Sequence, residues 1–136
     1  MNYLLVDGLN MFMRAKHVGG RGDSIDMKIG MAMHIMFNSI NKCWNKFDGN
    51  HVVICLEGRS WRKDFYKPYK ANRKVTLDKR SPREQEDDEL YFEAYDDMVQ
   101  FFANKTNCTV LRCETAEADD MIATWVQQHP QDNHMI

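Results

Sequence analysis

The 136-residue chain contains no apolar run that approaches the roughly 20 residues needed to cross a membrane as a helix. Its start, MNYLLVDG, lacks the basic and extended apolar regions of a secretory signal. The four cysteines form no Cys-x-x-Cys pair and stand among apolar residues, which favours buried, reduced thiols over zinc ligands or disulfides. We therefore expect a cytoplasmic protein without membrane contact.

The net charge of −2 does not by itself indicate a polyanion partner, but the distribution of charge does. Residues 59–83 contain only two acids, Asp64 and Asp78, and carry +8, which leaves −10 for the rest of the chain. A basic element on an acidic body is typical of a protein that contacts a polyanion through one surface. The bases are Arg59, Arg62, Lys63, Lys67, Lys70, Arg73, Lys74, Lys79, Arg80 and Arg83.

Short apolar runs and helical periodicity alternate along the chain, which predicts an α/β domain with a parallel sheet covered on both faces. Buried strands are expected at 3–6, 51–56 and 108–111, with a fourth starting at 133. Helices are expected at 27–47, 84–103 and 117–129. The glycine-rich segment 19–24 is expected to be a loop, and residues 66–83, which have little apolar periodicity, are expected to protrude.

Acidic residues follow each of the first three expected strands. Asp7 ends the first, Glu57 follows the second, and the cluster Glu117, Asp119 and Asp120 follows the third. Because ligands of open α/β sheets bind at the carboxyl ends of the strands, these acids are expected to converge. Oxygen ligands without histidine favour Mg²⁺ or Mn²⁺, ions that polarise a phosphodiester and activate water.

Each of these features also has a purely structural interpretation. Asp-Gly is a common turn, acids suit the start of a helix, and a charge run is often only a solvated face. The basic segment, however, carries aromatic residues between its charges. Aromatic rings among cations are what single-stranded nucleic acid binds, through base stacking and phosphate contacts. These rings belong to Trp61, Phe65, Tyr66 and Tyr69.

Three motifs resemble one family, in its order and spacing. LLVDGLNMFMRA is similar to the start, EGRSWRKDFYKPYKANR to the segment that leads into the helical arch, and AEADDMIA to an acidic helix start of phage and bacterial 5′–3′ exonucleases and flap endonucleases. These enzymes belong to the PIN-like 5′-nuclease superfamily. The resemblance implies a Rossmann-like parallel sheet with a protruding basic arch at about 66–88.

The resemblance also implies roles for individual residues. Lys70 and Arg73 are the catalytic pair expected to contact the scissile phosphate, and Tyr69 is expected to stack on the terminal base. Mg²⁺ is the expected cofactor, with Mn²⁺ as the alternative. The residues that correspond to metal ligands are Asp7, Glu57, Glu117, Asp119 and Asp120, of which Glu57 departs from the aspartate of many relatives. The expected nucleic-acid contacts are Arg62, Lys63, Tyr69, Lys70, Arg73 and Lys74.

Residues 1–136 resemble only the N-terminal portion of the nuclease domain, since the late T-D-x-D acidic motif and the duplex-binding module of the family are absent. A truncated protein, or a split one whose C-terminal half is a separate chain, would explain this. The implied substrate is DNA with a 5′ flap or 5′ single strand, or an RNA–DNA duplex, cut during replication, in the host cytoplasm if the gene belongs to a phage. The chain alone is expected to have little or no activity.

Two other functions remain open from the sequence. A small PIN-type ribonuclease would share the acids at the strand ends but not the basic arch-like insertion. A non-catalytic nucleic-acid-binding subunit would use the basic segment and pair the open strand edge at Met135 and Ile136 with a partner.

Overall fold

The computed structural model describes residues 1–20, 22 and 24–136, so positions 21 and 23 of the expected loop lie outside the description. Its centre is a four-stranded, fully parallel sheet with the order β3-β2-β1-β4. The strands are β1 (Asn2–Asp7), β2 (His51–Leu56), β3 (Thr109–Arg112) and β4 (Asn133–Met135). The chain builds outward from β1 to β3 and then returns to β4 on the other side, so the strand order reverses beside β1. A crevice at the carboxyl ends of the strands is expected at such a point.

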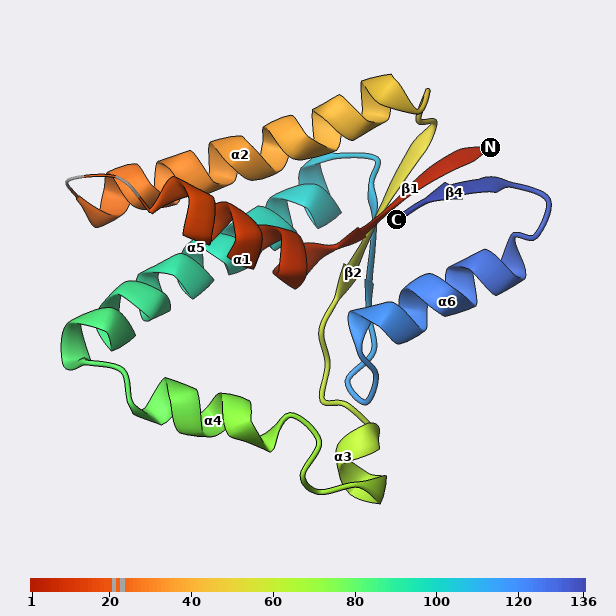
Figure 1. Ribbon diagram of the computed structural model, residues 1–136. Coiled ribbons are helices and arrows are strands. Elements are labelled where there is room, and N and C mark those ends of the chain that lie inside the picture. Colours follow the sequence, from red (N-terminus) through yellow and green to blue (C-terminus); the bar gives the residue numbers. More distant parts are fainter. Residues whose placement is uncertain (21, 23) are drawn as a thin grey trace.

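Helices cover both faces of the sheet, which confirms the expected α/β class (Figure 1). Residues of α1, α2 and α5 pack with one face of β1 and β2 in the larger core, and α6 packs on the opposite face in a smaller core. The strands contribute residues to both cores and read as nearly continuous apolar runs for that reason. The helices are α1 (Gly8–Gly19), α2 (Ile25–Lys46), α3 (Arg62–Phe65), α4 (Ala71–Asp78), α5 (Pro82–Lys105) and α6 (Ala118–Gln128).

Helix α1 was not expected, because Asp7-Gly8 reads as a turn. Instead, Asp7 caps the helix: its carboxylate accepts the backbone N–H of Asn10 at 3.1 Å. Phe12 of this helix is fully buried in the larger core. The first acid therefore lies at the capped junction between β1 and α1.

Helix α5 begins two residues earlier than expected. Ser81 and Glu84 form a capping box around Pro82, which occupies the first helical position. At the start of α5 the buried residue is Tyr91, whereas Leu90 and Phe92 on either side of it are each 42% exposed. One residue of shift turns a helical face by about 100°.

The segment between β2 and α5 contains α3 and α4, neither of which has a buried residue. Helix α4 lies away from the sheet, as the low apolar periodicity of residues 66–83 predicts (Figure 1). The far end of α4 is tied to the body because Asp88 of α5 forms ion pairs with Arg80 at 2.6 Å and with Lys16 of α1. The assignment of residues 66–88 as an arch that admits DNA remains a prediction.

The cysteines are only partly as expected. Cys55 is buried and Cys43 and Cys108 are half-buried, but Cys113 is exposed, because it lies in the loop that follows β3. All four are free thiols. None of the described helices is both long enough and apolar enough to span a membrane.

Gly58 allows the loop after β2 to pack on the loop that precedes α6. Its N–H donates to the carbonyl of Ala116 at 2.9 Å, and a Cβ added to Gly58 would lie 1.9 Å from the carbonyl oxygen of Cys113. We expect Gly58→Ala to lower the free energy of unfolding by about 2–3 kcal/mol, because backbone must move to make room. Urea denaturation measures this change.

Gly30→Ala is the matched control. A Cβ at Gly30, inside α2, would have no neighbour within 4 Å, so alanine should raise the stability by about 0.5–1 kcal/mol through helix propensity. Equal effects of the two substitutions would contradict the close packing assigned to Gly58.

Candidate active site

The carboxyl edge of the sheet carries an acidic row. Asp7 is the last residue of β1, Glu57 follows β2, and Glu117 immediately precedes α6. Together with Asp119 these acids line one cleft of about 900 Å³. The convergence expected from the parallel topology is therefore present in the structure.

The other wall of this cleft is basic and comes from α3, α4 and the loop between them. Its cations are Lys63, Lys67, Lys70, Arg73 and Lys74. Among the described residues, only Lys70 of these five has a carboxylate within ion-pair distance. The remaining four are exposed, so their charges face solvent across from the acids. A cleft with one acidic and one basic wall suits a ligand that carries a phosphate and a bound cation at the same time.

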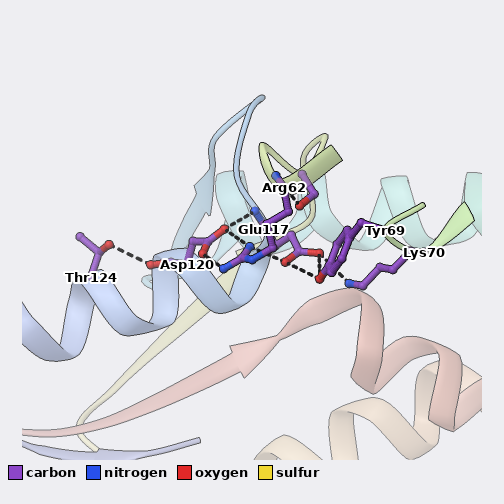
Figure 2. A network of polar contacts seen from close by, with 7 residues as sticks. Arg62, Tyr69, Lys70, Glu117, Asp120 and Thr124 are labelled. Carbon is purple, nitrogen blue, oxygen red and sulfur yellow. Dashed lines mark hydrogen bonds and ion pairs between the residues drawn. The ribbon is translucent and has the colours of Figure 1, made fainter. Parts of the chain in front are cut away.

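Glu117 is the centre of a polar network that joins the two walls (Figure 2). Its side chain is buried, and its carboxylate accepts hydrogen bonds from Arg62 Nη1 at 2.6 Å, from Lys70 Nζ at 2.6 Å and from Tyr69 Oη at 3.1 Å. The backbone of Lys70 adopts the left-handed conformation, with φ of 56°. Such a conformation costs a non-glycine residue about 1–3 kcal/mol and is typical of functional sites.

Asp120 points out of the cleft, toward Arg62. Arg62 Nη2 donates to Asp120 Oδ1 at 2.7 Å, and Asp120 Oδ2 accepts the backbone N–H of Glu117 at 3.0 Å. The guanidinium of Arg62 also lies over the ring of Trp61, 4.6 Å from its centroid. Asp120 thus orients both Arg62 and the backbone of Glu117 (Figure 2).

Two acids that lack a cationic partner, Asp7 and Glu57, have raised pKa values. Burial is the largest cause that raises the pKa of Asp7 above 3.8, and the charges of Asp119 and Glu117 add to it against the N–H of Asn10 and the charge of Lys70. Burial likewise raises the pKa of Glu57 above 4.5, followed by the charges of Asp7 and Glu117. These carboxylates therefore repel one another at neutral pH.

The pKa values of the two acids that are paired with cations, Glu117 and Asp120, are lowered instead. Burial alone would raise the pKa of Glu117, but the hydrogen bonds from Lys70 and Tyr69 outweigh it and lower that pKa below 4.5. The hydrogen bond from Arg62 is the largest cause that lowers the pKa of Asp120 below 3.8. The acids at this edge of the sheet thus divide into Glu117 and Asp120, which are paired with cations, and Asp7 and Glu57, which are not.

The donor set of the cleft fits a hard divalent cation, since four carboxylates and no imidazole line it. Within the described part of the chain, however, no three Asp, Glu, His or Cys side chains are close enough together to hold an ion. Two cations, Arg62 and Lys70, already bind the carboxylate of Glu117. A metal would have to displace Lys70 and Arg62 from this carboxylate.

Of the residues singled out from the sequence, Asp7, Glu57, Glu117 and Asp119 share the cleft, whereas Asp120 does not line it. Lys63, Tyr69, Lys70, Arg73 and Lys74 also line it. Arg62 is engaged with two acids rather than free in solvent. The roles assigned to all of these residues remain predictions.

Sequence reasoning missed some residues of the cleft. Lys67 lines it but was counted only as one of the basic residues, and Ser60, which is 4% exposed, lines it and accepts the backbone N–H of Arg62. Ser60 lies two residues before α3, and a small polar residue near a helix start was the available signal, since serine often accepts a backbone N–H there.

The uncompensated acids predict a stability that depends on pH. Asparagine in place of Asp7 keeps the helix cap but removes a charge whose pKa is raised in the fold. Without metal, the wild-type chain loses stability as pH rises from below 3.8 through the raised pKa, because the ionised form is disfavoured in the fold. We expect Asp7→Asn to be more stable by on the order of 1 kcal/mol at pH 7, with the difference vanishing below pH 3.8. Thermal unfolding in EDTA at both pH values measures it, and a less stable variant at pH 7 would contradict the repulsion.

The fold and the cleft define an α/β protein with acids at the carboxyl edge of a parallel sheet and a basic helical segment beside them. The sequence matches the family described as 5′–3′ exonuclease, N-terminal resolvase-like domain, over residues 2–136, so the chain belongs to that family. The resemblance inferred from the three motifs is thereby confirmed. No curated protein sequence gave a match.

Solved structures of bacteriophage T5 proteins are similar in fold. The T5 5′-exonuclease with bound zinc superposes with a TM-score of 0.75 at 24% identity, over 96% of this chain and 45% of that one. A T5 flap endonuclease variant in a pseudo-enzyme–product complex with DNA and metal ions gives 0.72 at 24% identity, with the same coverage. A T5 protein co-crystallised with metal ions gives 0.72 at 23% identity, over 96% of this chain and 44% of that one. At this identity the likeness establishes the fold, and the chain spans less than half the length of these proteins.

Proposed function

We propose that this chain supplies the first carboxylates and the basic wall of a Mg²⁺-dependent 5′-nuclease. The observation that carries the proposal is the cleft itself, in which four acids from three strand ends face five cations of one segment. Membership of the 5′–3′ exonuclease family supports the same reaction class. The T5 relatives that contain divalent metal ions support the cofactor class.

Asp7, Glu57, Glu117 and Asp119 would hold the cation, with Mn²⁺ as an alternative to Mg²⁺. A cation bound there supplies Lewis acidity and lowers the pKa of water. Asp120 would act from outside the cleft by keeping Glu117 in place through its backbone N–H. The raised pKa values of Asp7 and Glu57 fit sites that gain a compensating charge on binding.

The substrate would be DNA with a 5′ flap or a 5′ single strand, or an RNA primer on DNA during replication. The complex of the T5 flap endonuclease with DNA supports this substrate class. Exposed Trp61, Phe65 and Tyr66 would stack on bases, while Lys63 and Lys74 would pair with phosphates. Lys70 and Arg73 would neutralise the charge that develops on the scissile phosphate.

Residues 1–136 would form the N-terminal portion of the nuclease domain, with 66–88 as the arch. The T5 proteins are more than twice as long as this chain, so further acids and a duplex-binding module would come from a C-terminal portion, including one on a separate chain. On its own, the chain would bind DNA weakly and cleave little, and it would work in the cytoplasm, that of the host if a phage encodes it.

Binding and cleavage by the chain alone test this proposal. We expect the logarithm of DNA affinity to fall with the logarithm of salt concentration at a slope of about −3 to −5, as expected if about half or more of the segment's net charge engages single-stranded phosphates. Fluorescence anisotropy with a 5′-flap oligonucleotide measures it. Lys63→Ala, which removes one unpaired cation, should reduce the slope by about 0.7, whereas Glu114→Gln on an exposed loop should not.

Cleavage with Mg²⁺ separates the proposal from the other functions. Activity on flap DNA only after a C-terminal portion is supplied is the expected result. Specific cleavage of single-stranded RNA by the chain alone would favour a PIN-type ribonuclease. Binding without cleavage in the presence of that portion would favour a non-catalytic subunit.

A further inference from the structure

The hydroxyl of Tyr95 is a buried polar group without a partner. Tyr95 lies on α5 and is 8% exposed, and its Oη makes no hydrogen bond with any described residue. Phenylalanine would fill the same space without leaving a donor unpaired, and buried donors in proteins almost always have a partner. An orphaned hydroxyl therefore indicates a ligand, a water or a side chain that occupies its free side in the working protein.

This hydroxyl lies beneath the acidic wall of the cleft. A Cβ at Gly8 would lie 3.0 Å from Tyr95 Oη and 3.4 Å from the carbonyl oxygen of Cys55. Gly8 directly follows Asp7, and Cys55 is two residues before Glu57. The absence of a side chain at Gly8 leaves room for the hydroxyl at the junction of β1, α1 and the end of β2.

The hydroxyl of Tyr95 stays protonated in this site and can therefore donate a hydrogen bond. Burial raises the pKa of Tyr95 far above its ordinary value, and the charge of Asp7 raises it further. The hydroxyl is therefore neutral and carries a proton at all physiological pH values. The carboxylate of Asp7 has one oxygen, Oδ1, bonded to the N–H of Asn10. Its other oxygen accepts no hydrogen bond from any described residue.

We propose that Tyr95 is a positioning residue of the metal site, whose hydroxyl donates to the carboxylate of Asp7 through one ordered water. With Asn10 it fixes the carboxylate from two sides, so that the remaining lone pairs face the cation. Hydrogen bonds of this kind orient metal ligands, and their loss typically costs about 10–100-fold in metal affinity. This inference rests on the proposed metal site but concerns a residue outside the cleft lining.

Tyr95→Phe tests the inference, with Tyr91→Phe as the matched control. Tyr91 lies one turn earlier on α5, is also buried, and contacts Phe12 as Tyr95 does, but its charged neighbours are Lys16, Asp87 and Asp88. Calorimetric titration of the full chain with Mg²⁺ should give a Kd about 10–100-fold higher for Tyr95→Phe and an unchanged Kd for Tyr91→Phe. The metal-free melting temperature of Tyr95→Phe should not fall. Equal Mg²⁺ affinity of wild type and Tyr95→Phe would overturn the inference.

A second measurement keeps the inference testable without metal. In a chain labelled with ¹³Cζ-tyrosine, Asp7→Asn should shift the Tyr95 resonance and leave that of Tyr91 in place, because the charge of Asp7 acts on Tyr95 and not on Tyr91. No shift at Tyr95 would overturn the inference. A wild-type chain that binds no Mg²⁺ but shows this shift would overturn the proposed metal site and support the hydrogen bond.

Discussion

Glu117→Gln is expected to weaken Mg²⁺ binding by on the order of 100-fold or more, because it removes the acid around which both walls of the cleft meet. The same change should lower the free energy of unfolding by about 2 kcal/mol. Charge-assisted hydrogen bonds contribute about 1.5–3 kcal/mol each, and glutamine keeps the shape of the carboxylate but not its charge. The loss stays below that of a fully buried pair because Arg62 and Lys70, each about one-third exposed, regain water.

Glu114→Gln is the control for this substitution. It makes the same chemical change three residues earlier, on an exposed loop position whose side chain forms no ion pair within the described part of the chain. Titration calorimetry and urea denaturation of both variants separate the effect of the site from that of net charge. A Glu117→Gln chain with the Mg²⁺ affinity and stability of the wild type would contradict the assignment of Glu117 as a ligand.

The place of the acids could be predicted from the sequence because it depends on topology alone. Strands that alternate with helices become parallel, so Asp7 and Glu57 had to reach the same edge of the sheet. Strands that are buried on both faces appear in the sequence as continuous apolar runs, such as His51–Leu56. The strands of the sheet could therefore be predicted as well. No knowledge of side-chain conformation was needed for either result.

The ion pairs could not be predicted because they depend on the path of loops. Lys70 reaches Glu117 across 47 residues, and Arg62 reaches it across 55. Both contacts follow from the Gly58 loop and from a left-handed residue at position 70, features that periodicity does not reveal. For the same reason, the sequence did not reveal that Arg62 and Lys70 of the basic segment form ion pairs with acids at the carboxyl edge of the sheet.

In the proposed nuclease, these contacts would connect metal binding to DNA binding. Without a cation, Glu117 holds Lys70 and Tyr69, two of the residues expected to contact the substrate. A cation that takes the carboxylate would release both side chains toward the cleft. The two ligands should therefore bind cooperatively, and linkage requires that DNA raise the Mg²⁺ affinity by the same factor as Mg²⁺ raises the DNA affinity.

Lys70→Met is expected to change metal affinity and catalysis in opposite directions. Methionine keeps the length of the side chain but removes the charge that competes for Glu117 and opposes a cation nearby, so the metal-free chain should bind Mg²⁺ about tenfold more tightly. In the nuclease assembled with a C-terminal portion, kcat on flap DNA should fall by about 10²–10³, because the charge proposed to stabilise the transition state is lost.

Lys79→Met, at the far end of α4, is the control and should leave both quantities near those of the wild type, since Lys79 does not line the cleft. Calorimetry and single-turnover cleavage measure the two effects independently. Weaker Mg²⁺ binding in Lys70→Met would show that Lys70 supports the acid cluster rather than competing with the metal. Unchanged cleavage would remove Lys70 from the reaction. Only tighter metal binding together with slower cleavage fits a lysine whose ammonium group pairs with Glu117 until a metal cation replaces it.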